Sequence, residues 1–257
     1  MTQPTTDSSR LRALWRSNEA AIGGWSVSAD PLVAELVGAA DLDVVCVDAQ
    51  HGFVDTAMLP ALLEAMLAVG RVPLVRARWN DPGQIMRALD AGASGVIVPM
   101  VDDADGALAA ARACRFPPEG IRSWGPLWSA RPILQPVEAD ERTMCVVMVE
   151  TTGAVKHLDG ILATPGVDAL YIGPNDLALS CGFGRATYRT DPRVADLLGS
   201  ILARAHAAGV PVGVHCSDVA MAAEWRERGA DWLTALTDMD VLAQGLTATI
   251  GSLRQRG

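Results

Sequence analysis

Two stretches of this sequence decide the fold, Met144-Cys-Val-Val-Met-Val-Glu150-Thr and Ala169-Leu-Tyr-Ile-Gly-Pro-Asn-Asp176-Leu. Each is a short run of apolar and β-branched residues, which predicts a buried strand, and each run stops at a carboxylate. A helix is expected between them, from about residue 154 to 163. In a strand–helix–strand unit the two strands run parallel, so their carboxyl ends emerge side by side. Glu150 and Asp176 are therefore expected to lie close together.

This pair of carboxylates predicts a metal site. Two like charges in one small region repel each other unless a proton or a cation lies between them. A hard divalent ion such as Mg²⁺ suits ligand sets made of oxygen. The alternative for either residue alone is a helix N-cap, because acidic residues often follow strands.

The same alternation of strand and helix runs through the rest of the chain. After a polar tail and a first helix within residues 1–18, the expected strands are 21–28, 44–48, 72–76, 95–99, 144–149, 169–172, 210–216 and 231–234, and the last helix is 240–253. Eight right-handed crossovers predict one α/β domain over residues 1–257, a (β/α)₈ TIM barrel. A doubly wound sheet is disfavoured, because Gly23-Gly24 lacks the GxGxxG spacing.

Composition narrows the class of protein. Half of the 257 residues are hydrophobic, and the formal net charge of −9 argues against nucleic acid or an anionic membrane as partner. The five cysteines include no CxxC pair, which favours reduced thiols. The first ten residues lack the apolar core of a signal peptide, and no apolar run is long enough to span a bilayer. We expect a cytoplasmic protein.

The catalytic groups of a TIM barrel lie at the carboxyl ends of its strands. Besides Glu150 and Asp176, those ends carry Asp48-Ala-Gln50-His51-Gly52, Arg76 and His215. A metal pair, a histidine and an arginine are thus expected on one rim. The alternatives are that His51 is a plain pocket residue, that Arg76 is an ion-paired barrel residue and that His215 is structural filling.

The rim motifs resemble those of the class II pyruvate aldolases, of the 4-hydroxy-2-oxoheptanedioate aldolase type in the HpcH/HpaI family. In chain order they are Asp48-x-Gln-His-Gly, Pro73-Leu-Val-Arg with Trp79-Asn-Asp-Pro, Val98-Pro-Met-Val, Pro117-Pro-x-Gly-Ile-Arg122, Val149-Glu-Thr and Gly173-Pro-Asn-Asp-Leu. The match runs from about residue 22 to 253. It implies a phosphoenolpyruvate/pyruvate-type barrel that reversibly cleaves a 4-hydroxy-2-oxoacid to pyruvate and an aldehyde.

The resemblance also implies roles for individual residues. Glu150 and Asp176 would hold a divalent metal (Mg²⁺, Mn²⁺ or Co²⁺) that binds pyruvate. The metal and Arg76 would stabilise the enolate charge, and His51 would act as general base on the C4 hydroxyl. Asp90 matches the carboxylate that raises the basicity of this histidine, although it could simply be a solvent-facing residue at a helix end.

Substrate contacts are expected from the same rim and from a long proline-rich segment, residues 115–142. Three positions differ from the family pattern. Gln50 stands where the family usually has Glu, Met148 stands where it has Gln, and Asn175 stands where it has a small Ala. The resemblance thus implies a more apolar pocket with one charge fewer. The remaining candidates are Pro174 beside Asn175, and Arg122, Trp124, Trp128 and Arg131 in the long segment, where the tryptophans could equally serve loop packing or a subunit contact.

Two other functions remain open. One is a lyase of the same superfamily that cleaves a CoA thioester of the malyl-CoA or citramalyl-CoA type, and the other is a barrel that binds a metal–oxoacid complex without turnover. Relatives form homohexamers, as trimers of dimers that exchange the last helix. The segment 240–257 is therefore expected to pack on a neighbouring subunit.

Overall fold

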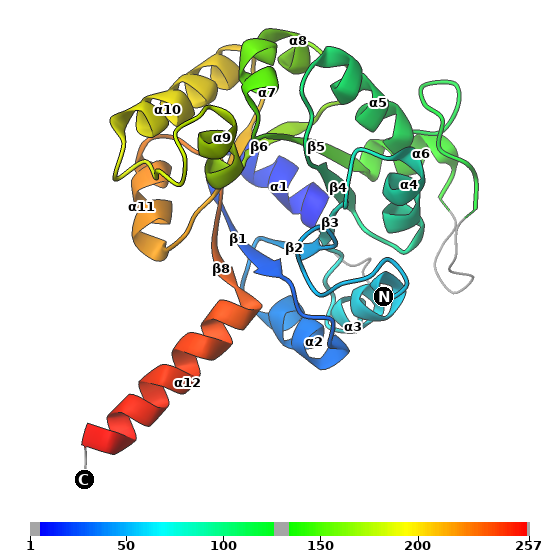
Figure 1. Ribbon diagram of the computed structural model, residues 1–257. Coiled ribbons are helices and arrows are strands. Elements are labelled where there is room, and N and C mark those ends of the chain that lie inside the picture. Colours follow the sequence, from blue (N-terminus) through cyan, green and yellow to red (C-terminus); the bar gives the residue numbers. More distant parts are fainter. Residues whose placement is uncertain (1–5, 126–133, 256–257) are drawn as a thin grey trace.

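Eight parallel strands close into a barrel in sequence order, β1 to β8, with each strand paired to its neighbour and β8 paired to β1 (Figure 1). The structure is a computed structural model that describes residues 6–125 and 134–255. The predicted TIM barrel is confirmed. The strands are β1 (Ala21–Ser26), β2 (Val44–Asp48), β3 (Leu74–Arg76), β4 (Gly95–Val98), β5 (Met144–Val149), β6 (Ala169–Ile172), β7 (Val212–His215) and β8 (Trp232–Thr237).

The described residues form twelve helices, and most of them surround the barrel between its strands (Figure 1). They are α1 (Asp7–Arg16), α2 (Pro31–Ala39), α3 (Leu59–Ala68), α4 (Pro82–Asp90), α5 (Ala104–Cys114), α6 (Pro136–Arg142), α7 (Thr152–Lys156), α8 (Leu158–Leu162), α9 (Pro174–Ser180), α10 (Pro192–Ala207), α11 (Val219–Glu227) and α12 (Asp238–Gln255). One detail differs from expectation. The helix expected at 154–163 is the pair α7 and α8, interrupted at His157.

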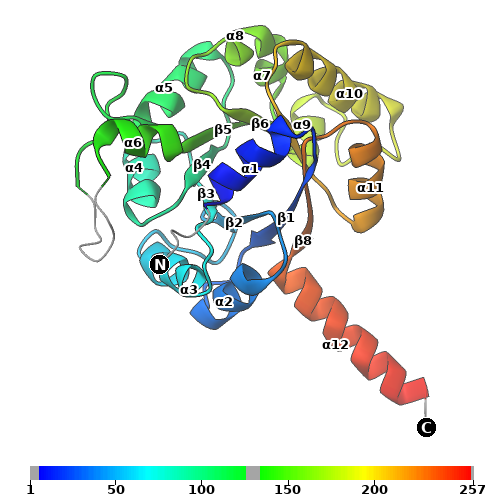
Figure 2. The same cartoon turned by 180° about the vertical axis from the view of Figure 1, so that it is seen from behind.

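The side chains of the strands separate into two buried layers, as a period of two requires. In β2, Val45 and Val47 pack outward against the helices, whereas Val44 and Cys46 point into the barrel. Leu11 of α1 joins the inner layer. Helix α1 therefore closes the amino-terminal end of the barrel (Figure 2). The strands finish at the other end, where the catalytic groups of a TIM barrel lie.

Three aromatic rings fill much of the barrel interior. Tyr171 stacks on Trp25 with ring centroids 5.3 Å apart and lies 4.7 Å from the Trp232 ring. Glycines on neighbouring strands make this possible. A Cβ on Gly213 would lie 2.4 Å from Tyr171 Cδ2, and one on Gly23 would lie 2.3 Å from Trp232 Nε1.

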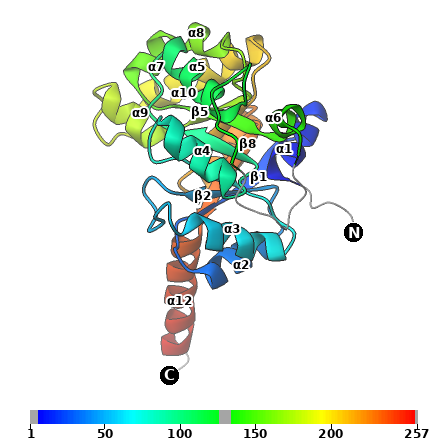
Figure 3. The ribbon, with the colours of Figure 1, turned by 90° about the vertical axis from the view of Figure 1, so that its right-hand side faces the viewer.

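Helix α12 leaves the barrel after β8 and points away from it (Figures 1 and 3). Among its side chains only Asp238 is buried. Asp238 accepts hydrogen bonds from Ser26 Oγ and from the backbone N–H groups of Val27 and Ser28, which fixes the start of the helix to the end of β1. None of the described helices combines the length and the hydropathy that crossing a membrane requires.

Candidate active site

Glu150 and Asp176 stand where the sequence predicts them, at the carboxyl ends of β5 and β6. Glu150 is 2% exposed, and its Oε1 accepts a hydrogen bond of 2.7 Å from the Met100 N–H. Burial raises the pKa of Glu150, and the negative charge of Asp176 raises it further, against the lowering effects of Met100 and Arg76. The two carboxylates therefore interact, and a cation between them would relieve both burial and repulsion.

Two backbone segments, at Met100 and at Gly173, approach the Glu150 side chain closely. Met100 has a φ of 56°, a left-handed conformation that costs free energy in a non-glycine residue and aims its N–H at the carboxylate. On the other side, a Cβ on Gly173 would lie 2.9 Å from Glu150 Oε2 and 3.1 Å from Met148 Cε. Residue type gives no signal for the left-handed Met100, so sequence reasoning missed its role.

The substrate candidates next to the carboxylates come from β5 and from the first turn of α9. Met148 is 2% exposed and belongs to the inner layer of the barrel. Pro174 begins α9, with Asn175 and Asp176 after it in the same turn, and both of these are exposed. Met148 is thus the apolar candidate on the barrel side, and Asn175 and Asp176 are the polar candidates at the start of α9.

Arg76 at the end of β3 is held by Asp48 at the end of β2. Arg76 Nε and Nη2 donate to the two carboxylate oxygens of Asp48 over 2.8 Å and 2.6 Å. Burial alone would raise the pKa of Asp48, but the hydrogen bonds and charge of Arg76 outweigh it and the pKa is lowered. Burial alone would lower the pKa of Arg76, and Asp48 raises it above its ordinary value. Both groups are therefore charged.

This fork leaves one edge of the guanidinium unused. In the described part of the chain, no hydrogen bond involves Arg76 Nη1. The Arg76 Cζ lies 5.1 Å from the centroid of the Trp25 ring, which fixes the plane of the group. The ion-paired alternative for Arg76 is thus true, and the pairing leaves Nη1 without a hydrogen-bond partner among the described residues.

His51 and Gln50 lie in the turn after β2. Asp48 Oδ1 accepts the N–H of both residues, so one carboxylate orients this turn as well as Arg76. The His51 side chain is exposed, whereas Gln50 Oε1 is buried without a hydrogen-bond partner in the described residues. Buried polar atoms are normally hydrogen-bonded, so Gln50 Oε1 requires a donor. No role was predicted for Asp48 from the sequence. An Asp whose carboxylate accepts the N–H of the residue two positions later is nevertheless typical of a turn.

Asp90, Arg122 and Trp124 lie at the opposite end of the barrel from these groups. Asp90 ends α4, just before β4 begins, and it pairs with Arg122 Nη2 over 2.9 Å. The Arg122 Cζ lies 4.7 Å from the Phe116 ring, which also contacts Trp124. Within one chain these residues therefore do not meet His51 or Glu150. Trp128 and Arg131 lie outside the described residues.

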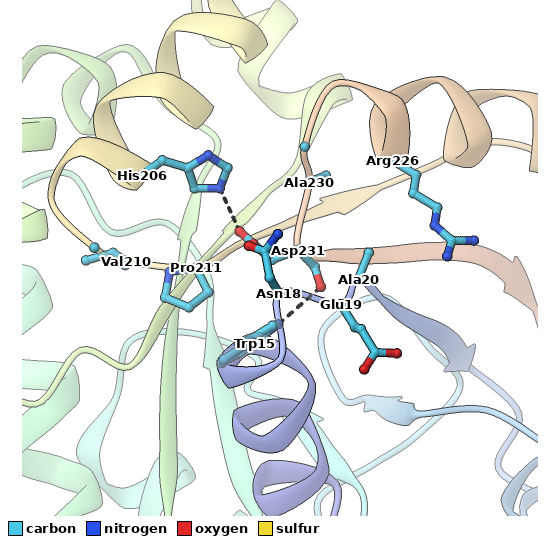
Figure 4. A pocket seen from close by; sticks show the side chains of 12 residues that line it. Trp15, Asn18, Glu19, Ala20, His206, Val210, Pro211, Arg226, Ala230 and Asp231 are labelled. Carbon is cyan, nitrogen blue, oxygen red and sulfur yellow. Dashed lines mark hydrogen bonds and ion pairs between the residues drawn. The ribbon is translucent and has the colours of Figure 1, made fainter.

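A cavity of about 720 Å³ lies at the amino-terminal end of the barrel (Figure 4). His206 and Asp231 pair across it over 2.8 Å, and Trp15 Nε1 donates to the Asp231 carbonyl. It lies at the end of the barrel that α1 closes, so it is separate from the candidate active site.

The two carboxylates fit a divalent cation as a partial ligand set. In residues 6–125 and 134–255, no cluster of three or more His, Cys, Asp or Glu could hold a metal. Mg²⁺ is commonly bound by one or two carboxylates, with water and substrate oxygens completing the octahedron. Buried Glu150 beside Asp176 supplies that minimum, and it leaves positions for a substrate.

Comparison with known proteins agrees with this geometry. The family model for HpcH/HpaI aldolase/citrate lyase matches residues 21–243. The chain belongs to the HpcH/HpaI family. It is 34% identical to a hydroxypyruvate/pyruvate aldolase of Rhizorhabdus wittichii, covering 95% of this chain and 98% of the relative. It is also 34% identical to a 4-hydroxy-2-oxo-heptane-1,7-dioate aldolase of Salmonella arizonae, covering 88% of each.

A solved structure shows the same family fold. An HpcH/HpaI aldolase/citrate lyase family protein from Burkholderia cenocepacia superposes with a TM-score of 0.87 at 30% identity, covering 96% of this chain and 99% of that chain. The barrel described above is thus that of an HpcH/HpaI family protein.

Proposed function

We propose that this protein is a divalent-metal-dependent pyruvate aldolase, which reversibly cleaves a 4-hydroxy-2-oxoacid to pyruvate and an aldehyde. Family membership and the names of the two relatives support the reaction class. The observation that carries the proposal is the pair of interacting carboxylates, Glu150 and Asp176, on the same rim as the charged Arg76. Mg²⁺, Mn²⁺ and Co²⁺ all accept such ligands.

The metal would be held by Glu150 and Asp176, and when bound it would supply a Lewis acid for the keto oxygen of pyruvate. The free Nη1 edge of Arg76 donates to that oxygen, which gains negative charge as the C3–C4 bond breaks. The bonding electron pair passes to the pyruvate fragment, and the C4 hydroxyl becomes the aldehyde carbonyl. His51 receives the hydroxyl proton, directly or through a water, and C3 of the pyruvate fragment then takes up a proton to complete pyruvate. Gln50 Oε1 accepts a hydrogen bond from the substrate or from that water.

The reaction is tested by pyruvate release from a panel of 4-hydroxy-2-oxoacids, coupled to lactate dehydrogenase. The protein is first treated with EDTA and then given Mg²⁺, Mn²⁺ or Co²⁺. We expect turnover that stops with the chelator and returns with the metal. Absence of turnover on every member of the panel would contradict the proposal.

Assembly of several subunits is part of this proposal. Five apolar residues of α12 are about half exposed or more, namely Val241, Leu242, Leu246, Ile250 and Leu253. The barrel exposes apolar side chains on β1 and α2, where Ile22 and Leu36 are at least 50% exposed. We propose that α12 of one subunit covers this face of a second copy, within a homohexamer built as a trimer of dimers.

Asp90 and Arg122 can serve the active site only across subunits. Each lies at the far end of its own barrel from His51, so the proposed support of His51 by Asp90 requires a neighbouring chain. Mixing His51→Ala and Asp90→Asn chains after co-expression tests this. Recovery of part of the wild-type activity in mixed oligomers is expected, whereas equally inactive mixtures would contradict it.

We also propose a cytoplasmic location. The five cysteines, Cys46, Cys114, Cys145, Cys181 and Cys216, are all free thiols. Free thiols are typical of reducing compartments.

A further inference from the structure

His215 ends β7 on the same rim as Glu150 and Arg76, and the proposed reaction gives it no role. Its Nδ1 lies 3.1 Å from the Tyr171 hydroxyl. Its ring meets the edge of the Trp25 ring, with the two centroids 5.1 Å apart. The imidazole is thus fixed by two aromatic residues of the barrel interior.

These contacts connect His215 with the group that faces the substrate. Trp25 lies between them, because the Arg76 guanidinium packs on the same Trp25 ring. Burial lowers the pKa of His215 to about 4, and the positive charge of Arg76 contributes to that lowering. His215 is therefore neutral at neutral pH and lies within electrostatic reach of Arg76.

His215 also lines a pocket of about 920 Å³ over the carboxyl ends of β7 and β8. The walls mix polar groups with apolar side chains such as Leu236 and Val241, and the arginine among them is already paired. Arg189 donates from Nη1 and Nη2 to the two carboxylate oxygens of Asp218. Asp240 is a further lining residue, so the pocket repels a carboxylate ligand. These walls therefore favour a neutral guest, and His215 offers it a group for hydrogen bonding.

The second ring nitrogen of His215 is available to such a guest. Among the residues the structure describes, no hydrogen bond involves His215 Nε2, whereas Nδ1 is taken by Tyr171. In a neutral imidazole Nε2 is a donor in one tautomer and an acceptor in the other. A hydroxyl group can act as either, so it pairs with both tautomers. An alkyl group would leave the nitrogen desolvated and unpaired, which is unfavourable.

We propose that His215 is a specificity-determining residue, which selects a short, neutral hydroxyaldehyde as the partner of pyruvate by hydrogen-bonding its hydroxyl. The aldehyde carbon then lies toward Arg76 and the two carboxylates, and the hydroxylated end lies toward the pocket beside β7. This inference rests on the proposed aldolase function and names the class of its second substrate.

The test compares glycolaldehyde with propanal, which have the same number of heavy atoms and differ in one hydroxyl. Aldol formation with pyruvate and Mg²⁺ is measured for the wild-type protein, His215→Leu and His215→Gln. We expect the ratio of kcat/KM for glycolaldehyde to that for propanal to fall about tenfold or more in His215→Leu. His215→Gln retains a hydrogen-bonding group and should keep most of the wild-type ratio.

An equal effect of His215→Leu on both aldehydes would overturn the proposal, as would a His215→Gln ratio as low as that of His215→Leu. The wild-type protein alone also tests it, because a higher kcat/KM for propanal than for glycolaldehyde excludes hydroxyl selection. His206→Leu, at the opposite end of the barrel, should leave the ratio unchanged. Exchange of pyruvate methyl protons requires no aldehyde. Its absence in the wild-type protein would overturn the aldolase function itself, and this inference with it.

Discussion

Arg76 donates two hydrogen bonds to the buried Asp48 carboxylate. We therefore expect activity to depend on the guanidinium group of Arg76 and not only on its charge. In Arg76→Lys the ammonium cannot bridge both Asp48 oxygens and also donate to a substrate oxygen. We expect kcat for aldol cleavage to fall by about a hundredfold or more, as when a preorganised donor is lost. The matched control is Arg193→Lys, whose guanidinium forms the same fork with Asp191 on the exposed surface. It should not change kcat, and a loss as large as that of Arg76→Lys would contradict this account.

His215 predicts a dependence of stability on pH. Its pKa is about 4 in the folded chain, against an ordinary value of 6.5. Between these values the unfolded chain binds a proton that the folded chain does not, so the free energy of unfolding falls as pH drops from 6.5 to 4. A shift of this size is worth about 3 kcal/mol at most. Urea denaturation at pH 7 and pH 4.5 should show a larger loss for the wild-type protein than for His215→Leu. Equal losses would contradict the assignment.

At the scale of residues, the sequence predicted the members of the rim better than their partners. Glu150, Asp176, Arg76 and His51 follow apolar runs, and strand ends share one rim in any parallel barrel. The N–H of Met100 that holds Glu150 depends on a backbone conformation that residue type does not reveal. Asp90 was tied to His51 by resemblance alone, and the fold puts the two at opposite ends of one barrel.

The junction between β6 and α9 carries Asp176 and approaches Glu150, the two carboxylates proposed to hold the metal, and Gly173 is the point of close approach. In Gly173→Ala the new Cβ would lie 2.9 Å from Glu150 Oε2 and displace it. We expect the apparent Kd for Mn²⁺, measured by calorimetry, to rise about tenfold, with the fold retained by circular dichroism. Gly199→Ala in α10 is the matched control, because its Cβ would meet no heavy atom within 4 Å. An unchanged Kd in Gly173→Ala would exclude this role for the junction.

At the scale of elements, apolar runs predicted all eight strands. Residue type alone did not predict at which end of the barrel a loop emerges. Residues 115–125 follow helix α5 and residues 134–142 precede β5, so both segments lie at the amino-terminal end of the barrel. Arg122 and Trp124 were expected at the substrate for their residue type, and the order of helix and strand places them at the other end of their own barrel from His51. Helix α9 was missed although Gly173-Pro174 is a helix-start signal.

For the whole molecule, the apolar face of α12 predicts association. Leu246→Glu puts a charge in the middle of that face, where Leu246 is 56% exposed. If α12 covers a second copy, the variant should dissociate at least partly, as measured by size-exclusion chromatography with light scattering. Ser252→Glu adds the same charge at an exposed polar position of α12 and should not change the mass. A wild-type protein that is already monomeric at micromolar concentration would contradict the proposed assembly.

The central claim, that Glu150 and Asp176 hold the metal that activates pyruvate, is tested most directly by exchange of pyruvate methyl protons in D₂O. Proton NMR follows the exchange for the wild-type protein, Glu150→Gln and Asp176→Asn, with EDTA and then with added Mg²⁺. The account predicts exchange in the wild-type protein that stops with EDTA and returns with Mg²⁺, and strongly reduced exchange in both variants. Exchange that persists in EDTA, or that is undiminished in Glu150→Gln, would contradict it.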